Sequence, residues 1–155
     1  MFNDIYKNFY YPMDEAKQKE ILERLNKANK NTLGETLEIT YTDVSENHLS
    51  ATMPVNSRVH QPYGILHGGA SCVLAETLGS CLSLINVDIT KSVPVGTNIN
   101  SNHLRAKRDG IVTGTATFIR KGNTMHVSQI EIRDEKGNLI NHTTMTNNIV
   151  PVGKV

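Results

Sequence analysis

The sequence contains no tryptophan, only two cysteines, and no apolar run of the roughly 18 residues that a membrane-spanning helix requires. It also lacks a strong excess of either charge, since 16 lysines and arginines face 15 aspartates and glutamates. A surface that binds nucleic acid usually shows a marked basic excess. The first residues do not follow the basic-then-apolar pattern of a secretory signal. We therefore expect a cytoplasmic protein that binds neither membranes nor nucleic acid.

The two cysteines do not favour a disulfide or a metal site. Cys72 and Cys81 fall in a predicted helix, where a separation of nine residues corresponds to about 13 Å, too far for a disulfide. The sequence has no CxxC or HExxH motif and no group of histidines and cysteines with the spacing of zinc ligands. We expect no metal and no redox cofactor.

The length of 155 residues fits one globular domain preceded by an N-terminal extension. Residues 1–32 are predicted as an arm and a helix, and residues 33–155 as the main domain. Residues 1–12 hold five of the eight aromatic residues, which favours an arm packed on the body or on a neighbouring subunit; lining of a ligand site is the alternative. Residues 13–30 carry apolar side chains at helical spacing, namely Ile21, Leu22, Leu25 and Ala28.

The remaining chain predicts an α+β fold, in which an antiparallel sheet packs one face against a long helix. Residues 36–55 read as two strands, because apolar residues alternate with polar ones at Leu37, Ile39, Tyr41, Leu49, Ala51 and Met53. Between His67 and Asp88 nearly all residues except Glu76 are apolar or small, and this segment reads as a buried helix. Residues 93–150 read as four strands, the first of which is expected to place Val95, Ile99 and His103 on one face.

Glu76 is the single charged residue between His67 and Asp88. Because its neighbours are apolar or small, we expect it to be substantially buried, which is costly unless the carboxylate has partners. This pattern favours a catalytic carboxylate in a cleft. The alternative is that Glu76 marks a solvent-facing edge of the helix.

Two glycines, Gly68 and Gly69, open the same helix. Exposed N–H groups at a helix N-terminus, together with the helix dipole, can stabilise a developing oxyanion; the alternative is a tight turn. Gly68 and Glu76 are separated by about 12 Å along one helix, whereas groups acting on one carbon must come within about 3–3.5 Å of it. If both are catalytic, Glu76 must therefore come from a second subunit whose helix runs antiparallel, as in a two-fold dimer.

Residues 51–80, which include the HGG…AE block, and residues 98–110 closely resemble the hotdog-fold acyl-CoA thioesterases of the phenylacetate-pathway and hydroxybenzoyl-CoA type. The resemblance covers about residues 33–150. It is strongest to the branch that hydrolyses dihydroxynaphthoyl-CoA in menaquinone synthesis or removes aroyl groups misloaded on a carrier protein. The resemblance implies a hotdog fold, an antiparallel sheet wrapped around a long central helix, and an edge-to-edge homodimer that often pairs again into a homotetramer.

The resemblance also implies catalytic roles. Glu76 matches the carboxylate that acts as nucleophile or as general base, and Gly68 matches the residue whose N–H polarises the thioester carbonyl. Gln61 and His67 match side chains that hydrogen-bond the thioester or help to release the thiol. Ser80, one helical turn beyond Glu76, matches a hydroxyl that positions water. His67 has a structural alternative, because it could simply cap the helix.

Further positions are matched to substrate binding. Thr77 replaces a serine often found beside the carboxylate, and His103 matches a histidine near the acyl pocket, although a packing role is equally open. Arg105, Lys107 and Arg108 could bind the phosphates of coenzyme A or could form an ordinary solvated face.

The resulting expectation is a thioester hydrolase that converts an acyl-CoA and water into a carboxylic acid and CoA, with CoA entering only as part of the substrate. An aromatic acyl group is favoured by the resemblance alone. Two alternatives stay open: a proofreading thioesterase that acts on acyl groups bound to a carrier protein, and a non-catalytic acyl-CoA-binding hotdog domain.

Overall fold

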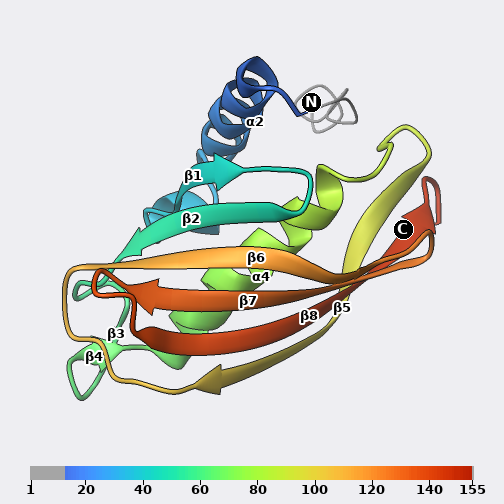
Figure 1. Cartoon of the computed structure of the whole chain (residues 1–155). Helices are drawn as coiled ribbons and strands as arrows, with labels where there is room; N and C mark the ends of the chain where they lie inside the picture. Colours follow the sequence, from blue (N-terminus) through green and yellow to red (C-terminus); the bar gives the residue numbers. More distant parts are fainter. Residues whose placement is uncertain (1–12, 155) are drawn as a thin grey trace.

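A six-stranded antiparallel sheet wraps around the long helix α4 (Gly68–Leu84), as Figure 1 shows. The computed structural model describes residues 13–154, so the predicted aromatic arm at residues 1–12 lies outside the described residues. The strands follow the order β1-β2-β6-β7-β8-β5. Their bounds are β1 (Thr40–Val44), β2 (His48–Pro54), β5 (Ser92–His103), β6 (Ile111–Lys121), β7 (Met125–Asp134) and β8 (Leu139–Pro151). The predicted α+β architecture and the predicted central helix are confirmed.

Two helices precede the sheet: α2 (Glu15–Ala28) and α3 (Leu33–Thr36). Asp14 caps α2 by accepting a hydrogen bond from the Lys17 N–H, and the apolar stripe of α2 is buried at Ile21 and Leu25. The helix predicted over residues 13–30 is therefore confirmed to within two residues at each end. The short helix α3 was not predicted, and it ends at Thr36 with Leu37 as its C-cap, so the first strand begins later than the alternation suggested.

Helix α2 closes one edge of the sheet (Figure 1). The Asn26 side chain hydrogen-bonds both backbone groups of Tyr41, accepting from its N–H at 2.8 Å and donating to its C=O at 3.0 Å. Asn29 donates to the C=O of Ile39 at 2.8 Å. These side chains occupy the backbone groups through which β1 could pair with another strand.

The opposite edge, formed by β5, is open within the described residues, and the stretch 96–100 is exposed. A β-bulge interrupts the pairing of β5 with β8 between Gly96 and Asn98. Because the extra residue reverses the alternation, Val95 pairs with exposed Asn148 on the outer face, whereas Ile99 and His103 face the helix. The prediction that Val95 shares a face with Ile99 and His103 is therefore wrong.

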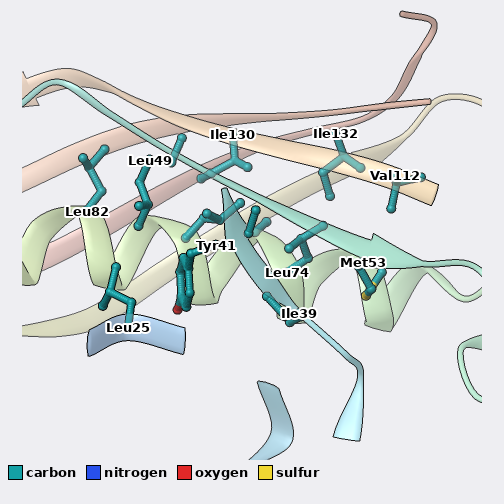
Figure 2. Close-up of a cluster of buried hydrophobic side chains, with 14 of the residues drawn as sticks. Leu25, Ile39, Tyr41, Leu49, Met53, Leu74, Leu82, Val112, Ile130 and Ile132 are labelled. Atoms are coloured by element: carbon teal, nitrogen blue, oxygen red, sulfur yellow. The ribbon is translucent and has the colours of Figure 1, made fainter. Parts of the chain in front are cut away.

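The core lies between α4 and the inner faces of the strands (Figure 2). Helix α4 contributes buried residues along most of its length, and they meet apolar side chains of β2, β6 and β7 such as Leu49, Met53, Val112, Ile130 and Ile132. Gly79 allows the helix to approach the sheet closely, because a Cβ at this position would lie 2.8 Å from the Met145 sulfur. This packing fixes the position of α4 relative to β5 and β8.

A small hairpin, β3 (His60–Gln61) and β4 (Ile65–Leu66), forms within the segment predicted as a loop. The Leu66 N–H donates to the Lys107 C=O at 2.7 Å, and the His67 N–H donates to the Val59 C=O at 2.8 Å. These bonds hold the hairpin beside the start of α4 and beside the segment that follows β5.

Candidate functional site

A cavity of about 360 Å³ lies at the N-terminal end of α4. Its walls are formed by the β3–β4 hairpin, the first turn of α4 and the end of β5. Its lining residues are Gln61, Ile65, Leu66, Gly68, Ser71, His103, Leu104, Arg105, Ala106 and Ile140. The fold thus brings together four of the predicted site residues: Gln61, Gly68, His103 and Arg105. We call this space the donor cavity, because hydrogen-bond donors lie at its wall.

The N-terminus of α4 offers a free backbone donor. His67 is the N-cap, and its Nδ1 accepts the Gly69 N–H at 2.8 Å. His67 therefore does cap the helix, and because its Nδ1 accepts a hydrogen bond, the ring proton lies on Nε2. The Gly68 N–H makes no hydrogen bond within residues 13–154. Because the helix dipole adds partial positive charge here, this N–H can stabilise a carbonyl oxygen that gains negative charge.

Gln61 supplies a second donor. Its Oε1 accepts the Tyr63 N–H at 2.8 Å, which fixes the orientation of the amide because a backbone N–H can only donate. The amide NH₂ makes no hydrogen bond to any described residue. Gln61 can therefore donate to a ligand in the donor cavity.

His103 lies over the start of α4. A Cβ built on Gly68 would be 2.6 Å from the His103 Nε2, so any larger residue at this position would have to displace the imidazole. On its other side, the His103 Nδ1 lies 3.0 Å from the Asn141 amide nitrogen. Asn141 was not predicted from the sequence as a site residue. The available signal was polarity at inward-facing positions of β8, where Asn141, Thr143 and Asn147 interrupt the apolar pattern.

Glu76 lies in a different place, a hollow of about 160 Å³ that we call the acid hollow. It is lined by Glu76, Gly96, Thr97, Asn98, Ile99 and Met145. The Glu76 Oε1 is 3.7 Å from the position of a Cβ on Gly96. The prediction that Glu76 is substantially buried is wrong for the single chain, where its side chain is exposed. The reason is that Glu76 faces the open β5 edge, where Gly96 has no side chain to cover it.

Ser80 and Thr77 line neither the donor cavity nor the acid hollow. Both are half-buried. The Ser80 hydroxyl is directed at the Met145 sulfur, 4.0 Å away, and Met145 itself lines the acid hollow. Ser80 thus lies near Glu76, as its spacing on the helix predicts, and away from Gly68.

The three residues of the basic cluster have different surroundings. Lys107 pairs with Glu135, and its side chain is only 13% exposed. That contact, with the Ile111 N–H, lowers the pKa of Glu135 to about 2. Arg108 donates weakly to the Tyr63 C=O at 3.4 Å, and Arg105 lines the donor cavity. Arg105 is thus the cation best placed to meet a bound anion.

The described part of the chain, residues 13–154, shows neither a group of three or more potential metal-ligating His, Cys, Asp or Glu side chains nor a helix able to span a membrane. Cys72 and Cys81 are both free thiols. The candidate site consists of hydrogen-bond donors at the start of α4 and on the β3–β4 hairpin, and of a carboxylate about two turns further along α4.

Comparisons with known proteins show the family to which the chain is related. Residues 63–141 match the model of the thioesterase superfamily. The 1,4-dihydroxy-2-naphthoyl-CoA hydrolase of Escherichia coli K12 is 42% identical over 86% of this chain and 98% of its own. The proofreading thioesterase EntH of Cronobacter turicensis is 44% identical over 78% of this chain and 88% of its own. The crystal structure of a glutamine-to-alanine variant of a Pseudomonas aeruginosa thioesterase superposes with a TM-score of 0.83, at 44% identity, covering 84% of this chain and 94% of that one.

Proposed function

The chain belongs to the thioesterase superfamily and has its hotdog fold, and from this premise we propose that it hydrolyses an aromatic acyl-CoA, such as dihydroxynaphthoyl-CoA, in the cytoplasm. The products are the carboxylic acid and free CoA. The aromatic acyl group is supported by the Escherichia coli relative, whose name gives dihydroxynaphthoyl-CoA as its substrate.

The proposal rests on the distance between the hydrogen-bond donors at the start of α4 and the carboxylate of Glu76 further along the same helix. In the donor cavity, the Gly68 N–H and the Gln61 amide hold the thioester oxygen, and their dipoles favour the charge that develops when the carbonyl is attacked. Glu76 supplies the carboxylate, either as the nucleophile or as the base that takes a proton from water. Since Glu76 of the same chain is in another hollow, the acting carboxylate comes from a second copy.

The open β5 edge supports a specific homodimer. Glu76 lies beside residues 96–99 of β5, and the donor cavity lies beside His103 at the end of the same strand. Antiparallel pairing of two β5 strands centred on Asn100 would place Thr97 opposite the partner subunit's His103. The acid hollow of each copy would then meet the donor cavity of the other and cover Glu76. Two such dimers would form the homotetramer that the family resemblance implies.

The cations near the donor cavity suit the phosphates of CoA to different degrees. Arg105 lines the cavity and is exposed, and Arg108 is exposed beside the hairpin. Lys107 is already neutralised by Glu135 and is largely covered. We therefore assign phosphate binding to Arg105 and Arg108 and assign Lys107 a structural role.

The test uses the purified protein with a panel of aromatic and aliphatic acyl-CoAs and detects the released thiol. We expect turnover of aromatic substrates by the natural protein and its near-complete loss in Glu76→Ala, while the dimer is retained by size-exclusion chromatography. Glu76→Asp, which withdraws the carboxylate by about one methylene, should also lose most of its kcat. Near-normal turnover by Glu76→Ala, or tight binding of the CoA esters without hydrolysis, would contradict the proposal.

The similarity to EntH supports a second candidate, hydrolysis of acyl groups misloaded on a carrier protein. In that case the exposed Arg105 and Arg108 would face an acidic carrier protein instead of CoA phosphates. A comparison of kcat/KM for the same acyl group attached to CoA and to a carrier protein separates the two candidates, because the preferred carrier gives the higher value.

A further inference from the structure

We propose that Asn141 is a positioning residue that holds the His103 ring neutral, with its proton on Nε2, so that His103 presents an N–H beside the free N–H of Gly68. The proposal concerns residues that lie on the inner faces of β5 and β8. Asn141 and Thr143 are fully buried, and each pairs across the strands with a residue of β5: Asn141 with His103, and Thr143 with Ser101.

The side chains of Asn141, Thr143, Ser101 and His103 form one hydrogen-bond network in which the donor of each bond can be assigned. The Asn141 amide nitrogen donates to the Ser101 hydroxyl at 2.8 Å, and the Thr143 hydroxyl donates to the Asn141 Oδ1 at 2.8 Å. Because the single hydroxyl proton of Thr143 is used in this way, the Ser101 hydroxyl must be the donor in its 2.8 Å bond to Thr143. The second amide proton of Asn141 points to the His103 Nδ1 at 3.0 Å. Nδ1 must therefore accept, and the ring proton lies on Nε2.

Reversing the Asn141 amide would be less favourable. In the reversed orientation, the oxygen would accept from both Ser101 and His103, and the NH₂ group would donate only to Thr143. One amide proton of a fully buried side chain would then lack an acceptor, whereas the observed orientation uses both protons. An unpaired buried donor is more costly than an oxygen that accepts one hydrogen bond instead of two.

The consequence for the donor cavity is a further N–H, in addition to those of Gly68 and Gln61, on a ring that lies against the first residue of α4. The His103 Nε2 lies 2.6 Å from the position of a Cβ on Gly68, so the two donors are immediate neighbours at the cavity wall. Two adjacent N–H groups can both donate to one carbonyl oxygen and stabilise the negative charge that it gains during attack. The catalytic part of this inference rests on the proposed function, whereas the position of the ring proton does not.

The tautomer can be measured directly on the ligand-free protein. Histidine is labelled with ¹⁵N, and long-range ¹H–¹⁵N spectra are recorded at about pH 8.5, where imidazoles are ordinarily neutral. The His103 signals are assigned by their loss in His103→Gln. We expect Nδ1 to resonate as an unprotonated nitrogen and Nε2 as a protonated one. His67, whose Nδ1 accepts a backbone N–H, provides an internal reference with the same pattern. A proton on the His103 Nδ1 would overturn the proposal.

Two variants test the positioning role. In Asn141→Asp the carboxylate can only accept, so the ring proton should move to Nδ1 and kcat should fall about a hundred-fold, with a smaller change in KM. Thr143→Val removes the hydroxyl that orients Asn141 at nearly constant volume, and should populate both tautomers and lower kcat about ten-fold. The control is Asn148→Asp, on the exposed outer face of β8, which should keep the natural spectrum and turnover.

The measurements separate this proposal from the proposed function. If the protein hydrolyses none of the thioesters offered, the proposed function fails while the wild-type spectrum still decides the tautomer. If Asn141→Asp does not fold, the wild-type and Thr143→Val spectra decide it. Full turnover by a folded Asn141→Asp with the proton still on Nε2 would show that Asn141 does not position His103.

Discussion

The imidazole of His103 lies against the first residue of α4, so that a Cβ built on Gly68 would be 2.6 Å from Nε2 and 2.8 Å from Cε1. This contact joins the end of the edge strand β5 to the start of the central helix. It places one histidine and one free backbone N–H at the same wall of the donor cavity. The chemistry proposed for the cavity depends on this contact remaining as close as it is.

Gly68→Ala tests the contact. The backbone N–H is retained, but the added methyl group must displace His103, and we expect kcat to fall by about a hundred-fold through loss of aligned donors. Steady-state kinetics with the best acyl-CoA measures the change, and circular dichroism checks that the helix is intact. Unchanged kcat in a folded variant would show that the position of His103 over Gly68 is not needed for turnover.

A mixed dimer tests the division of the site between two copies. Glu76→Ala and His103→Ala are produced with different tags, each nearly inactive alone, and allowed to exchange subunits. Each heterodimer then contains one site with both residues intact and one with neither. Since random exchange yields half heterodimers, we expect about a quarter of the wild-type activity to return. If the mixture stays inactive while heterodimers are recovered with both tags, Glu76 and His103 act within the same chain.

Glu135→Gln tests the ion pair that anchors the segment after β5. The Lys107 hydrogen bond and the Ile111 N–H lower the pKa of Glu135 from 4.5 to about 2. A carboxyl group whose pKa is lower in the folded state stabilises the fold above its unfolded pKa and loses this effect as the pH falls toward the folded value. We therefore expect the variant to have a Tm lower by a few degrees at pH 7 and the difference to shrink between about pH 4.5 and pH 2.

The control for this measurement is Glu46→Gln. Glu46 is exposed and makes no hydrogen bond within the described residues, so its replacement should leave the Tm unchanged at each pH. A pH-independent difference for Glu135→Gln would mean that the amide substitution disturbs packing and that the ion pair contributes nothing.

Gly79→Ala tests the close approach of α4 to the sheet. In an exposed helix this change is expected to stabilise by about 1 kcal/mol, because glycine is a poor helix former. Here the new methyl group would lie 2.8 Å from the Met145 sulfur and 3.1 Å from the Ser128 hydroxyl, and overpacking costs about 1–3 kcal/mol. We expect a net loss of stability in urea-induced unfolding. A stabilised variant would indicate that Met145 moves aside at little cost.

The elements of the fold could be predicted because their patterns are local. The helical spacing of Ile21 and Leu25, the small and apolar residues around Glu76, and the alternation in the later strands each depend only on neighbours in sequence. The bulge in β5 could not be predicted in this way. It depends on how Gly96 and Asn98 align with β8, and this alignment decides that Val95 faces outward.

The candidate site could be predicted only where it depends on local sequence patterns. Gln61, Gly68 and His103 do meet in one cavity, and the eight-residue spacing of Gly68 and Glu76 does place these two residues in separate hollows. The burial of Glu76 was predicted wrongly, because a helix of small residues indicates close packing but does not show which chain provides the covering surface. Asn141 was missed because its significance comes from the residue opposite it on β5.

The two edges of the sheet differ in a way that limits how copies of this protein can polymerise. The Asn26 and Asn29 side chains hydrogen-bond backbone groups of Tyr41 and Ile39. A strand of another molecule would therefore find few unpaired N–H and C=O groups at the β1 edge. Within the described residues, only the edge formed by β5 can therefore pair with a strand of another molecule. If two molecules pair through their β5 strands, neither retains a second unpaired edge. Further strand addition toward a fibril would then end at the dimer.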